Sequence, residues 1–147
     1  MGPWLLSITV EPMGIKGISH ATFIVRDLER MAALFRGVLG ADEVYDSKDR
    51  NYSLSREKFF VLGGVWIAAM EGTPPAERSY RHLAFEVDEA DLASFEEGIR
   101  GLGLDVLPPR PRVEGEGVSL YFYDFDNHLF ELHTGTLDAR LKRYAEP

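Results

Sequence analysis

An internal repeat constrains the fold of this sequence more than any other feature. Residues 17–25 and 80–87 each carry alternating apolar and polar side chains, followed by an aspartate, an amphipathic stretch and closely spaced glycines. Alternation with a period of two predicts a strand, and apolar residues three or four positions apart predict a helix. Each copy of the repeat is therefore predicted to open as a strand followed by a helix.

The two predicted strands carry histidines at matching positions. Phe23 and Val25 share one face of the first strand, and Phe85 lies on the corresponding face of the second. The helical spacing that follows is carried by Leu28, Met31, Ala32, Phe35 and Leu39 in the first copy and by Leu92, Phe95, Ile99 and Leu102 in the second. Because strand side chains alternate, His20 and His82 are expected to project from the faces opposite to those that pack on the helices.

Short strand-like runs follow each predicted helix. They cover residues 43–45, 52–56 and 58–69 in the first copy and residues 104–107, 119–123 and 128–133 in the second. The sequence thus predicts an α+β domain over residues 17–145, built from two βαβββ modules at residues 17–72 and 79–134 and a C-terminal helix at residues 136–145. Thr73-Pro74-Pro75 is expected to link the modules. Residues 1–16 are expected to form an extension of unknown role.

Composition excludes several classes of protein. The 147 residues, 45% of them hydrophobic, are enough for one buried core, and 16 Lys and Arg against 24 Asp and Glu give a formal net charge of -8. A protein that coats nucleic acid needs a basic face, so no nucleic-acid partner is expected. The longest nearly apolar run, residues 59–70, contains two glycines and is shorter than the roughly 20 residues of a membrane-spanning helix, so no membrane segment is expected.

The sequence contains no cysteine, which removes disulfides, thiolate nucleophiles and cysteine-bound zinc together. Any metal must therefore be held by His, Asp or Glu. The apolar run at residues 4–6 is accompanied by no Lys or Arg within residues 1–13 and by no convincing cleavage site, so a signal peptide is not expected. A cytoplasmic location is the expectation for this chain.

The matched histidines are the strongest indication of chemistry. A lone histidine on a strand is usually a polar residue with ordinary hydrogen bonds, and that interpretation is the better one for His20 or His82 taken singly. Two modules related by a pseudo-twofold axis would direct both imidazoles towards that axis. The matched pair therefore favours a shared metal site.

The last predicted strand supplies a carboxylate. Alternation places Leu129, Glu131 and His133 on one face and two apolar residues on the other. Burying Glu131 is unfavourable unless a cation or strong donor accompanies it, whereas the alternative is an edge strand with a solvated face. Two histidines, one carboxylate and a free fourth position are typical of an open catalytic metal site. His128 is expected at the surface and His133 in a supporting or structural role, so neither is predicted to be a ligand.

Several blocks of sequence, in order, resemble a known family over nearly all of residues 17–145. The blocks are Gly17-Ile18-Ser19-His20 and residues 54–60, 77–82, 110–117 and 121–133. Together they are similar to the FosX family, the fosfomycin-hydrolysing branch of the vicinal oxygen chelate superfamily. The resemblance implies paired βαβββ modules that form a partly closed mixed sheet around a metal.

The resemblance also implies a ligand set and a reaction. A divalent metal, usually Mn2+ although other divalent metals are compatible, would be held by His20, His82 and Glu131, and would act as a Lewis acid on the epoxide of fosfomycin. Water would be the nucleophile. Glu57 matches the family's general base; its alternative interpretation is an ordinary exposed strand glutamate beside Arg56.

Further residues match positions around the substrate. Thr22 matches a threonine near the reacting epoxide, although threonine is also common in strands simply because it favours them. Arg140 and Tyr121 match residues at the phosphonate. Arg112 and Ser119 flank the loop at residues 114–117 and are additional substrate-binding candidates, with a solvated charge cluster as the alternative for Arg112.

The leading functional hypothesis is metal-dependent hydration of fosfomycin to its vicinal diol, which confers resistance to the antibiotic. Fosfomycin and water are the expected substrates. By resemblance, the working unit is a homodimer whose metal sites are shared between chains, with pairing of the modules within one chain as the alternative. Two other functions remain open from the sequence: transfer of a thiol to the same epoxide, and binding of a small molecule without catalysis.

Overall fold

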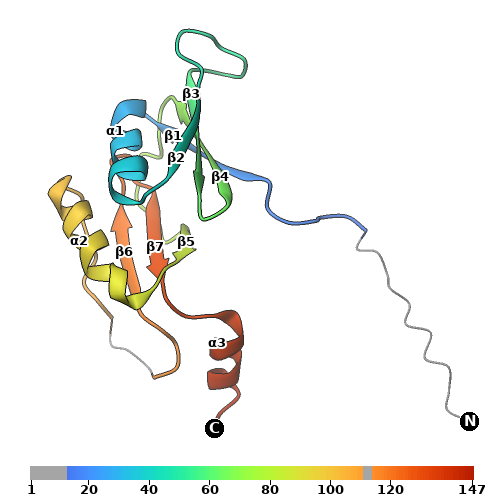
Figure 1. Cartoon of the computed structure of the whole chain (residues 1–147), viewed down its shortest axis with the longest axis vertical. Coiled ribbons are helices and arrows are strands. Elements are labelled where there is room, and N and C mark those ends of the chain that lie inside the picture. Colours follow the sequence, from blue (N-terminus) through green and yellow to red (C-terminus); the bar gives the residue numbers. More distant parts are fainter. Residues whose placement is uncertain (1–12, 111–113) are drawn as a thin grey trace, which may run out of the picture.

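The structure is a computed structural model that describes residues 13–110 and 114–147, and it contains two sheets (Figure 1). The first sheet, in the order β1-β4-β3-β2, is formed by β1 (His20–Val25), β2 (Asp42–Asp46), β3 (Glu57–Leu62) and β4 (Val65–Glu71). The second sheet, in the order β5-β7-β6, is formed by β5 (His82–Glu86), β6 (Ser119–Tyr123) and β7 (Leu129–His133). Residues 1–12 of the predicted extension lie outside the described residues.

The two sheets repeat one pairing pattern. β1 runs parallel to β4, and β5 runs parallel to β7, while the remaining strand pairs are antiparallel. The first strand of each module therefore lies beside the last. In this register Glu131 of β7 lies between Ala84 of β5 and Tyr121 of β6. The predicted α+β fold of two related modules with mixed sheets is confirmed.

Two of the helices lie on one side of the sheets, and the C-terminal helix lies beyond the end of the last strand (Figure 1). α1 (Leu28–Ala32) begins at Asp27, whose carboxylate accepts hydrogen bonds from the N–H groups of Glu29 and Arg30, and it continues as the π-helix η1 (Ala33–Val38). The short 3-10 helix η2 (Glu89–Asp91) leads into α2 (Leu92–Gly101). α3 (Leu137–Tyr144) follows the last strand and is capped by Thr136. The C-terminal helix is thus where the sequence predicts it.

One hydrophobic core joins the two modules. Phe35 of η1 stacks on Phe60 of β3 at 5.3 Å between ring centroids, and it meets Phe130 of β7 edge-on at 5.8 Å. All three rings are fully buried, as is Ile99 of α2. Because aromatic side chains bury large areas, these contacts couple the first sheet to the second. The faces of both sheets that carry His20 and His82 are turned away from this core.

Three predicted strand runs differ from the structure. Residues 52–56 form bends rather than a strand, and the run at residues 58–69 is divided into β3 and β4 by a tight turn. Gly63 and Gly64 both have positive φ, 56° and 78°, as a two-residue hairpin turn requires. Residues 104–107 make only an isolated bridge, from Val106 to Phe122. The prolines that follow have no N–H with which to extend that pairing.

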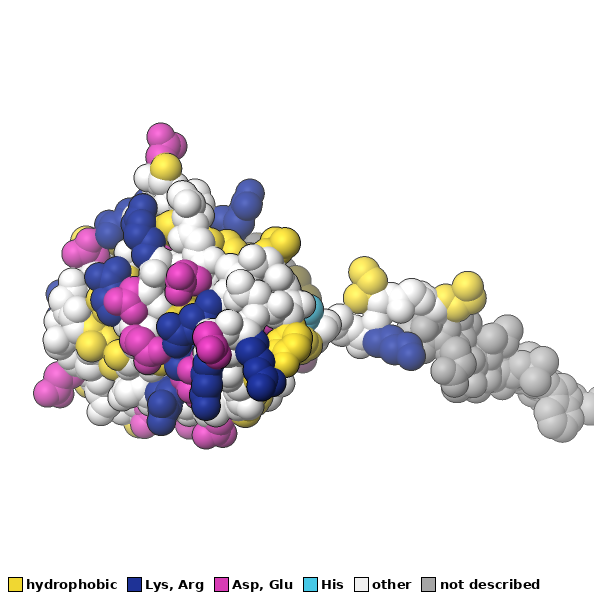
Figure 2. Space-filling view, turned by 90° about the horizontal axis from the view of Figure 1, so that it is seen from above, with side chains coloured by type: hydrophobic (Ala, Val, Ile, Leu, Met, Phe, Trp, Pro, Cys, Tyr) yellow, Lys and Arg dark blue, Asp and Glu magenta, His cyan; other side chains and the backbone are white. Residues whose placement is uncertain are grey.

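Residues 13–19, before β1, project away from the body of the molecule (Figures 1 and 2). Met13 and Ile15 are almost fully exposed there. Figure 2 also shows acidic and basic side chains interspersed on the face it presents. Within residues 13–110 and 114–147, none of the helices has the length and apolar character needed to span a membrane.

Candidate metal site and substrate pocket

His82 and Glu131 meet on the second sheet. The Nε2 atom of His82 lies 3.0 Å from Oε1 of Glu131, and the other ring nitrogen, Nδ1, donates to the carbonyl oxygen of Tyr80 at 2.7 Å. That second bond leaves the lone pair of Nε2 directed at the carboxylate. Two electron-pair donors facing each other at this distance need a cation or a proton between them, which is the arrangement of two neighbouring metal ligands.

These two residues line a pocket of about 620 Å³. The pocket is bounded by the second sheet, by residues 107–110 and by α3. Its polar lining includes Ser119, Tyr121, His133 and Arg140. The structure therefore brings the predicted ligands His82 and Glu131 together with three of the four predicted substrate-binding residues. The fourth, Arg112, lies outside the described residues.

Tyr121 is held as a hydrogen-bond donor. Burial raises its pKa far above the ordinary value, and the hydrogen bond with Tyr80 and the charge of Glu131 raise it further. The two phenol oxygens lie 3.1 Å apart, and NH2 of Arg110 donates to both at 3.2 Å. Tyr121 thus remains a neutral phenol beside a fixed positive charge.

Tyr80 and Arg110 were not predicted as pocket residues. Arg110 lies in a proline-rich run with no periodicity that would assign it to a face, and Tyr80 precedes its strand. A signal for Tyr80 does exist in retrospect, because it is two positions before His82 and so shares its side in extended chain. Nothing comparable identifies Arg110.

His20, Thr22 and Glu57 lie together on the first sheet. Thr22 pairs with Ala68, which pairs with Phe59, so His20 and Thr22 share a face with Glu57, two positions before Phe59. The ring of His20 lies against Trp66 at 4.2 Å between centroids. We call His20, Thr22 and Glu57 the first half-site, and the set His82, Ser119, Tyr121, Glu131 and Arg140 the second half-site.

Within a single chain, the described residues do not bring the two half-sites together. Among the residues that the structure describes, no group of three or more His, Asp or Glu side chains is placed to hold a metal ion. His20 therefore does not complete a ligand set with His82 and Glu131 within a single chain. That separation agrees with the expectation that the metal site is shared between chains, which stays a prediction.

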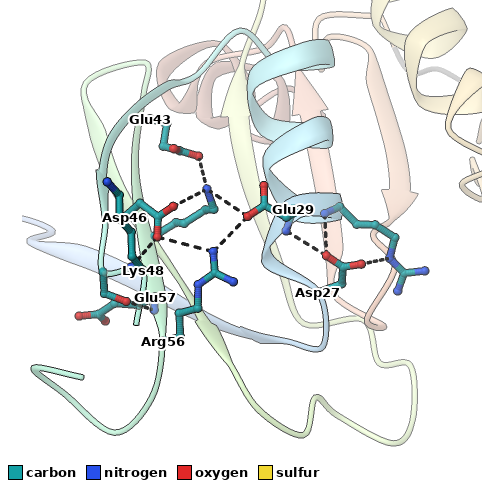
Figure 3. A network of polar contacts seen from close by, with 10 residues as sticks. Asp27, Glu29, Glu43, Asp46, Lys48, Arg56 and Glu57 are labelled. Carbon is teal, nitrogen blue, oxygen red and sulfur yellow. Dashed lines mark hydrogen bonds and ion pairs between the residues drawn. The ribbon is translucent and has the colours of Figure 1, made fainter. Parts of the chain in front are cut away.

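Glu57 is buried, with 7% of its surface exposed, and is not the exposed strand glutamate of the alternative interpretation. Its N–H donates to Oγ of Ser47 at 2.9 Å, which fixes the start of β3. Its carboxylate forms no ion pair with the Lys and Arg side chains of the described residues. In Figure 3 that carboxylate points away from the neighbouring ion-pair network.

The network on the other face of β3 is centred on Lys58 (Figure 3). Its Nζ atom lies 3.0 Å from Glu43, 3.1 Å from Asp46 and 3.6 Å from Glu29. Burial by itself would lower the pKa of Lys58, but the hydrogen bonds to Glu43 and Asp46 outweigh it and hold the pKa above its ordinary value. Lys58 is thus charged and paired with three carboxylates. It therefore does not neutralise the charge of Glu57, which lies on the opposite face of β3.

The remaining two histidines have defined roles. His128, expected at the surface, is largely buried, since Nδ1 binds Asp124 at 2.7 Å and its ring meets Phe23 edge-on at 5.0 Å. The reason is that the turn at residues 124–128 folds back onto β1. His133 lies between Ser119 and Arg140, in contact with both.

The family relationship is clear from sequence. Residues 17–132 match the family model of the Glyoxalase/Bleomycin resistance protein/Dioxygenase superfamily. The fosfomycin resistance protein FosX of Mesorhizobium japonicum is 61% identical over 132 residues, covering 90% of this chain and 95% of that protein. FosX of Listeria monocytogenes is 52% identical, with 90% and 99% covered. The metallothiol transferase FosB of Shouchella clausii is 37% identical, with 88% of each chain covered.

Solved structures give the same relationship. A variant of FosX from Listeria monocytogenes, in complex with Mn(II) and 1S,2S-dihydroxypropylphosphonic acid, superposes with a TM-score of 0.80 at 50% identity, covering 89% of this chain and 99% of that one. FosX from Mesorhizobium loti superposes with a TM-score of 0.79 at 57% identity, covering 88% and 100%. This chain therefore belongs to the Glyoxalase/Bleomycin resistance protein/Dioxygenase superfamily and, within it, to the FosX family of fosfomycin resistance proteins.

Proposed function

We propose that this protein is a Mn(II)-dependent epoxide hydrolase that converts fosfomycin to its vicinal diol and so confers resistance to the antibiotic. The observation that carries the proposal is the approach of His82 Nε2 to Glu131 Oε1 at 3.0 Å, in a pocket lined by Ser119, Tyr121 and Arg140. The identity of 61% to FosX against 37% to a metallothiol transferase supports water rather than a thiol as the nucleophile.

The residues present fit a divalent metal. His82 has its Nδ1 proton committed to Tyr80, so Nε2 is available, and one carboxylate oxygen of Glu131 faces it. Nitrogen and oxygen ligands of this kind suit Mn(II) and accept other divalent metals. His20 from the first half-site would be the third protein ligand. When bound, the cation supplies Lewis-acid polarisation of the epoxide oxygen and offsets the negative charge that develops there.

The second half-site orients the substrate. The guanidinium of Arg140 and the phenol of Tyr121 are donors in the pocket, and phosphonate oxygens are acceptors only. Because the pKa of Tyr121 is raised, the phenol keeps its proton. We propose that Arg140 and Tyr121 bind the phosphonate and hold the epoxide carbon at a fixed position, while Ser119 lies at the same wall of the pocket.

Glu57 is proposed as the general base. Its carboxylate is buried and has no cationic partner among the described side chains, so it can accept a proton from water. As the water oxygen bonds to a ring carbon, one C–O bond of the epoxide breaks and one proton of the water passes to Glu57. The epoxide oxygen, left as an alkoxide, takes a proton from solvent to become the second hydroxyl of the diol, and Glu57 returns its proton to solvent. Thr22, on the same face, is proposed to lie beside the reacting ring.

The two half-sites are proposed to meet between two chains of a homodimer. Each chain carries one face with His20 and Glu57 and another with His82 and Glu131, and the described residues do not join them within the chain. Two copies arranged about a twofold axis would form two complete sites. We propose that the dimer acts in the cytoplasm, with fosfomycin and water as its substrates.

The direct test is to incubate purified protein with Mn(II) and fosfomycin, with no thiol present, and to follow the product by phosphorus NMR. Formation of the diol is expected. Activity that requires a thiol would instead indicate a transferase, and binding without turnover would indicate a sequestering protein. The Glu57→Gln variant should lose the reaction, whereas the exposed Glu97→Gln variant is the matched control and should retain it.

A further inference from the structure

We infer that His133 is a positioning residue that couples the arginine of the substrate pocket to the metal-binding carboxylate, through a directed chain of hydrogen bonds from Arg140 to Glu131. The inference rests on the proposed function, because it deepens the roles of Arg140 and Glu131. Its physical content is that loss of Arg140 changes the metal affinity of Glu131, although the two side chains are joined only through His133 and Ser119.

The chain of contacts is continuous. NH2 of Arg140 lies 3.2 Å from Nε2 of His133, whose Nδ1 lies 2.7 Å from Oγ of Ser119. Ser119 in turn donates from Oγ to Oε2 of Glu131 at 2.6 Å. His133 Nδ1 is also 3.2 Å from that same carboxylate oxygen.

The donors and acceptors along this series of hydrogen bonds fix its direction. A guanidinium only donates, so Nε2 of His133 must accept from Arg140. Ser119 spends its single hydroxyl proton on Glu131, so Nδ1 of His133 must donate to the Ser119 oxygen. His133 is therefore neutral with its proton on Nδ1, and each donor in the chain is matched to an acceptor.

Two glycines lie close to each other, and one of them lies close to the imidazole ring of His133. A Cβ atom on Gly135 would lie 2.6 Å from Nε2 of His133 and 2.6 Å from the carbonyl oxygen of Glu116. A Cβ atom on Gly117 would lie 2.6 Å from the backbone nitrogen of Gly135. The loop at residues 114–117 and the turn after β7 thus pack closely together beside the imidazole, whose side chain is only 16% exposed. That confinement is what a positioning role needs.

As a consequence, the two oxygens of the Glu131 carboxylate have different partners. Oε2 is engaged by Ser119 and His133, which leaves Oε1 directed at His82 and the metal position. At the other end, Arg140 is oriented by one N–H, which leaves its other donors for the phosphonate. Groups that orient metal ligands in this way typically change metal affinity about 10–100-fold when removed.

Three variants of His133 separate the two ends of the chain. His133→Leu removes both hydrogen bonds, and we expect the Mn(II) dissociation constant, measured by electron paramagnetic resonance titration, to rise about 10-fold or more. His133→Asn retains a donor near the Nδ1 position but loses the bond from Arg140, so Mn(II) affinity should fall only as far as in Arg140→Ala while the KM for fosfomycin rises. His133→Gln retains an acceptor near Nε2 and should show the opposite pattern. A purely structural role would change all three variants alike, in proportion to their loss of thermal stability.

The coupling itself is tested at Arg140. Arg140→Ala should weaken Mn(II) binding in the wild-type background but not further in the His133→Leu background. Unchanged Mn(II) affinity in Arg140→Ala, or effects of the two substitutions that simply multiply, would overturn the inference. His128→Asn, which alters a histidine bound to Asp124 outside the pocket, is the matched control and should leave Mn(II) affinity unchanged.

A spectroscopic measurement is independent of turnover. In 15N-labelled protein without metal at pH 8, the histidine ring correlations lost in His133→Asn should belong to a neutral ring with a protonated Nδ1 and a bare Nε2. A protonated Nε2 would contradict the directed chain. If no diol forms in the activity assay but this tautomer and the Arg140 effect on Mn(II) affinity are found, the proposed reaction fails while the coupling stands.

Discussion

At the scale of single residues, the chemistry depends on how each charge is paired. Glu57 and Lys58 are adjacent in sequence and buried, yet Lys58 is surrounded by three carboxylates whereas Glu57 forms no ion pair within residues 13–110 and 114–147. A carboxylate paired with lysine would be a poor proton acceptor, because the charge favours its ionised form. The alternation of β3 places the two side chains on opposite faces and so keeps them apart.

Replacing Glu57 by Gln should therefore remove the base without disturbing the metal site. We expect kcat to fall by about 10²–10⁴-fold, the range typical for loss of a general base. Mn(II) affinity, measured by electron paramagnetic resonance, should be nearly unchanged because Glu57 is not a proposed ligand. Turnover by Glu57→Gln at the wild-type rate would exclude Glu57 as the base.

At the scale of elements, the sequence predicts the strands and helices that have a clear period and misses those that depend on tertiary contacts. The matched faces of β1 and β5 follow from alternation, and the predicted C-terminal helix corresponds to α3. Tyr52 and Leu54 also alternate, but they are 71% and 89% exposed and pair with no strand. Alternation alone cannot distinguish a paired strand from an exposed loop.

The residues of the site also fall into those that the sequence predicts and those that it does not. Glu131 could be assigned to the pocket face from its strand alone, whereas the burial of His128 depends on Asp124 and on Phe23, which is distant in sequence. Arg110 reaches Tyr121 only through the path of an aperiodic segment. Roles that depend on the period of one strand were predictable, and roles that depend on the meeting of separate segments were not. The ligand set and the base remain predictions.

The Lys58 network should contribute measurably to stability, because it ties β2 and β3 to α1 (Figure 3). Lys58→Met should lower the free energy of unfolding in urea by about 2–3 kcal/mol, somewhat less than the 3–5 kcal/mol of a fully buried pair because the carboxylates are partly exposed. Lys48→Met, at an exposed position whose side chain makes no contact among those described, is the control. Equal stability of the two variants would show that the network is only a surface feature.

Asp46 should make part of that stability depend on pH. The backbone N–H of Lys48 holds the pKa of Asp46 below its ordinary value, and the hydrogen bond and charge of Lys58 lower it further. Because the folded pKa is lowered, the stabilisation is present above the unfolded value of about 3.9 and is lost as pH falls through the folded value.

Urea unfolding between pH 3 and pH 7 tests this contribution. Asp46→Asn should be less stable than wild type at pH 7, and the difference should shrink below about pH 4 as the wild-type carboxyl becomes protonated. Asp49→Asn, at an exposed position in the following loop, should follow the wild-type curve. A difference that stays constant across the range would rule out the ionised form of Asp46 as the stabilising species.

At the scale of the whole molecule, each chain presents two incomplete faces. The first half-site holds His20 and the proposed base, and the second holds His82 and Glu131, the proposed metal ligands, with the proposed phosphonate donors. One hydrophobic core fixes both sheets, so neither face can turn towards the other without disrupting Phe35, Phe60 and Phe130. A second copy of the chain is the simplest source of the missing half.

Mixing two inactive proteins tests this central claim most directly. His20→Ala and His82→Ala homodimers should each lose tight Mn(II) binding and activity, since every site in them lacks one ligand. After subunit exchange, a heterodimer would contain one site with both lesions and one intact site, so the mixture should recover activity towards half of wild type per heterodimer. A mixture that exchanges subunits, as verified by mass spectrometry, yet stays inactive would contradict the shared site.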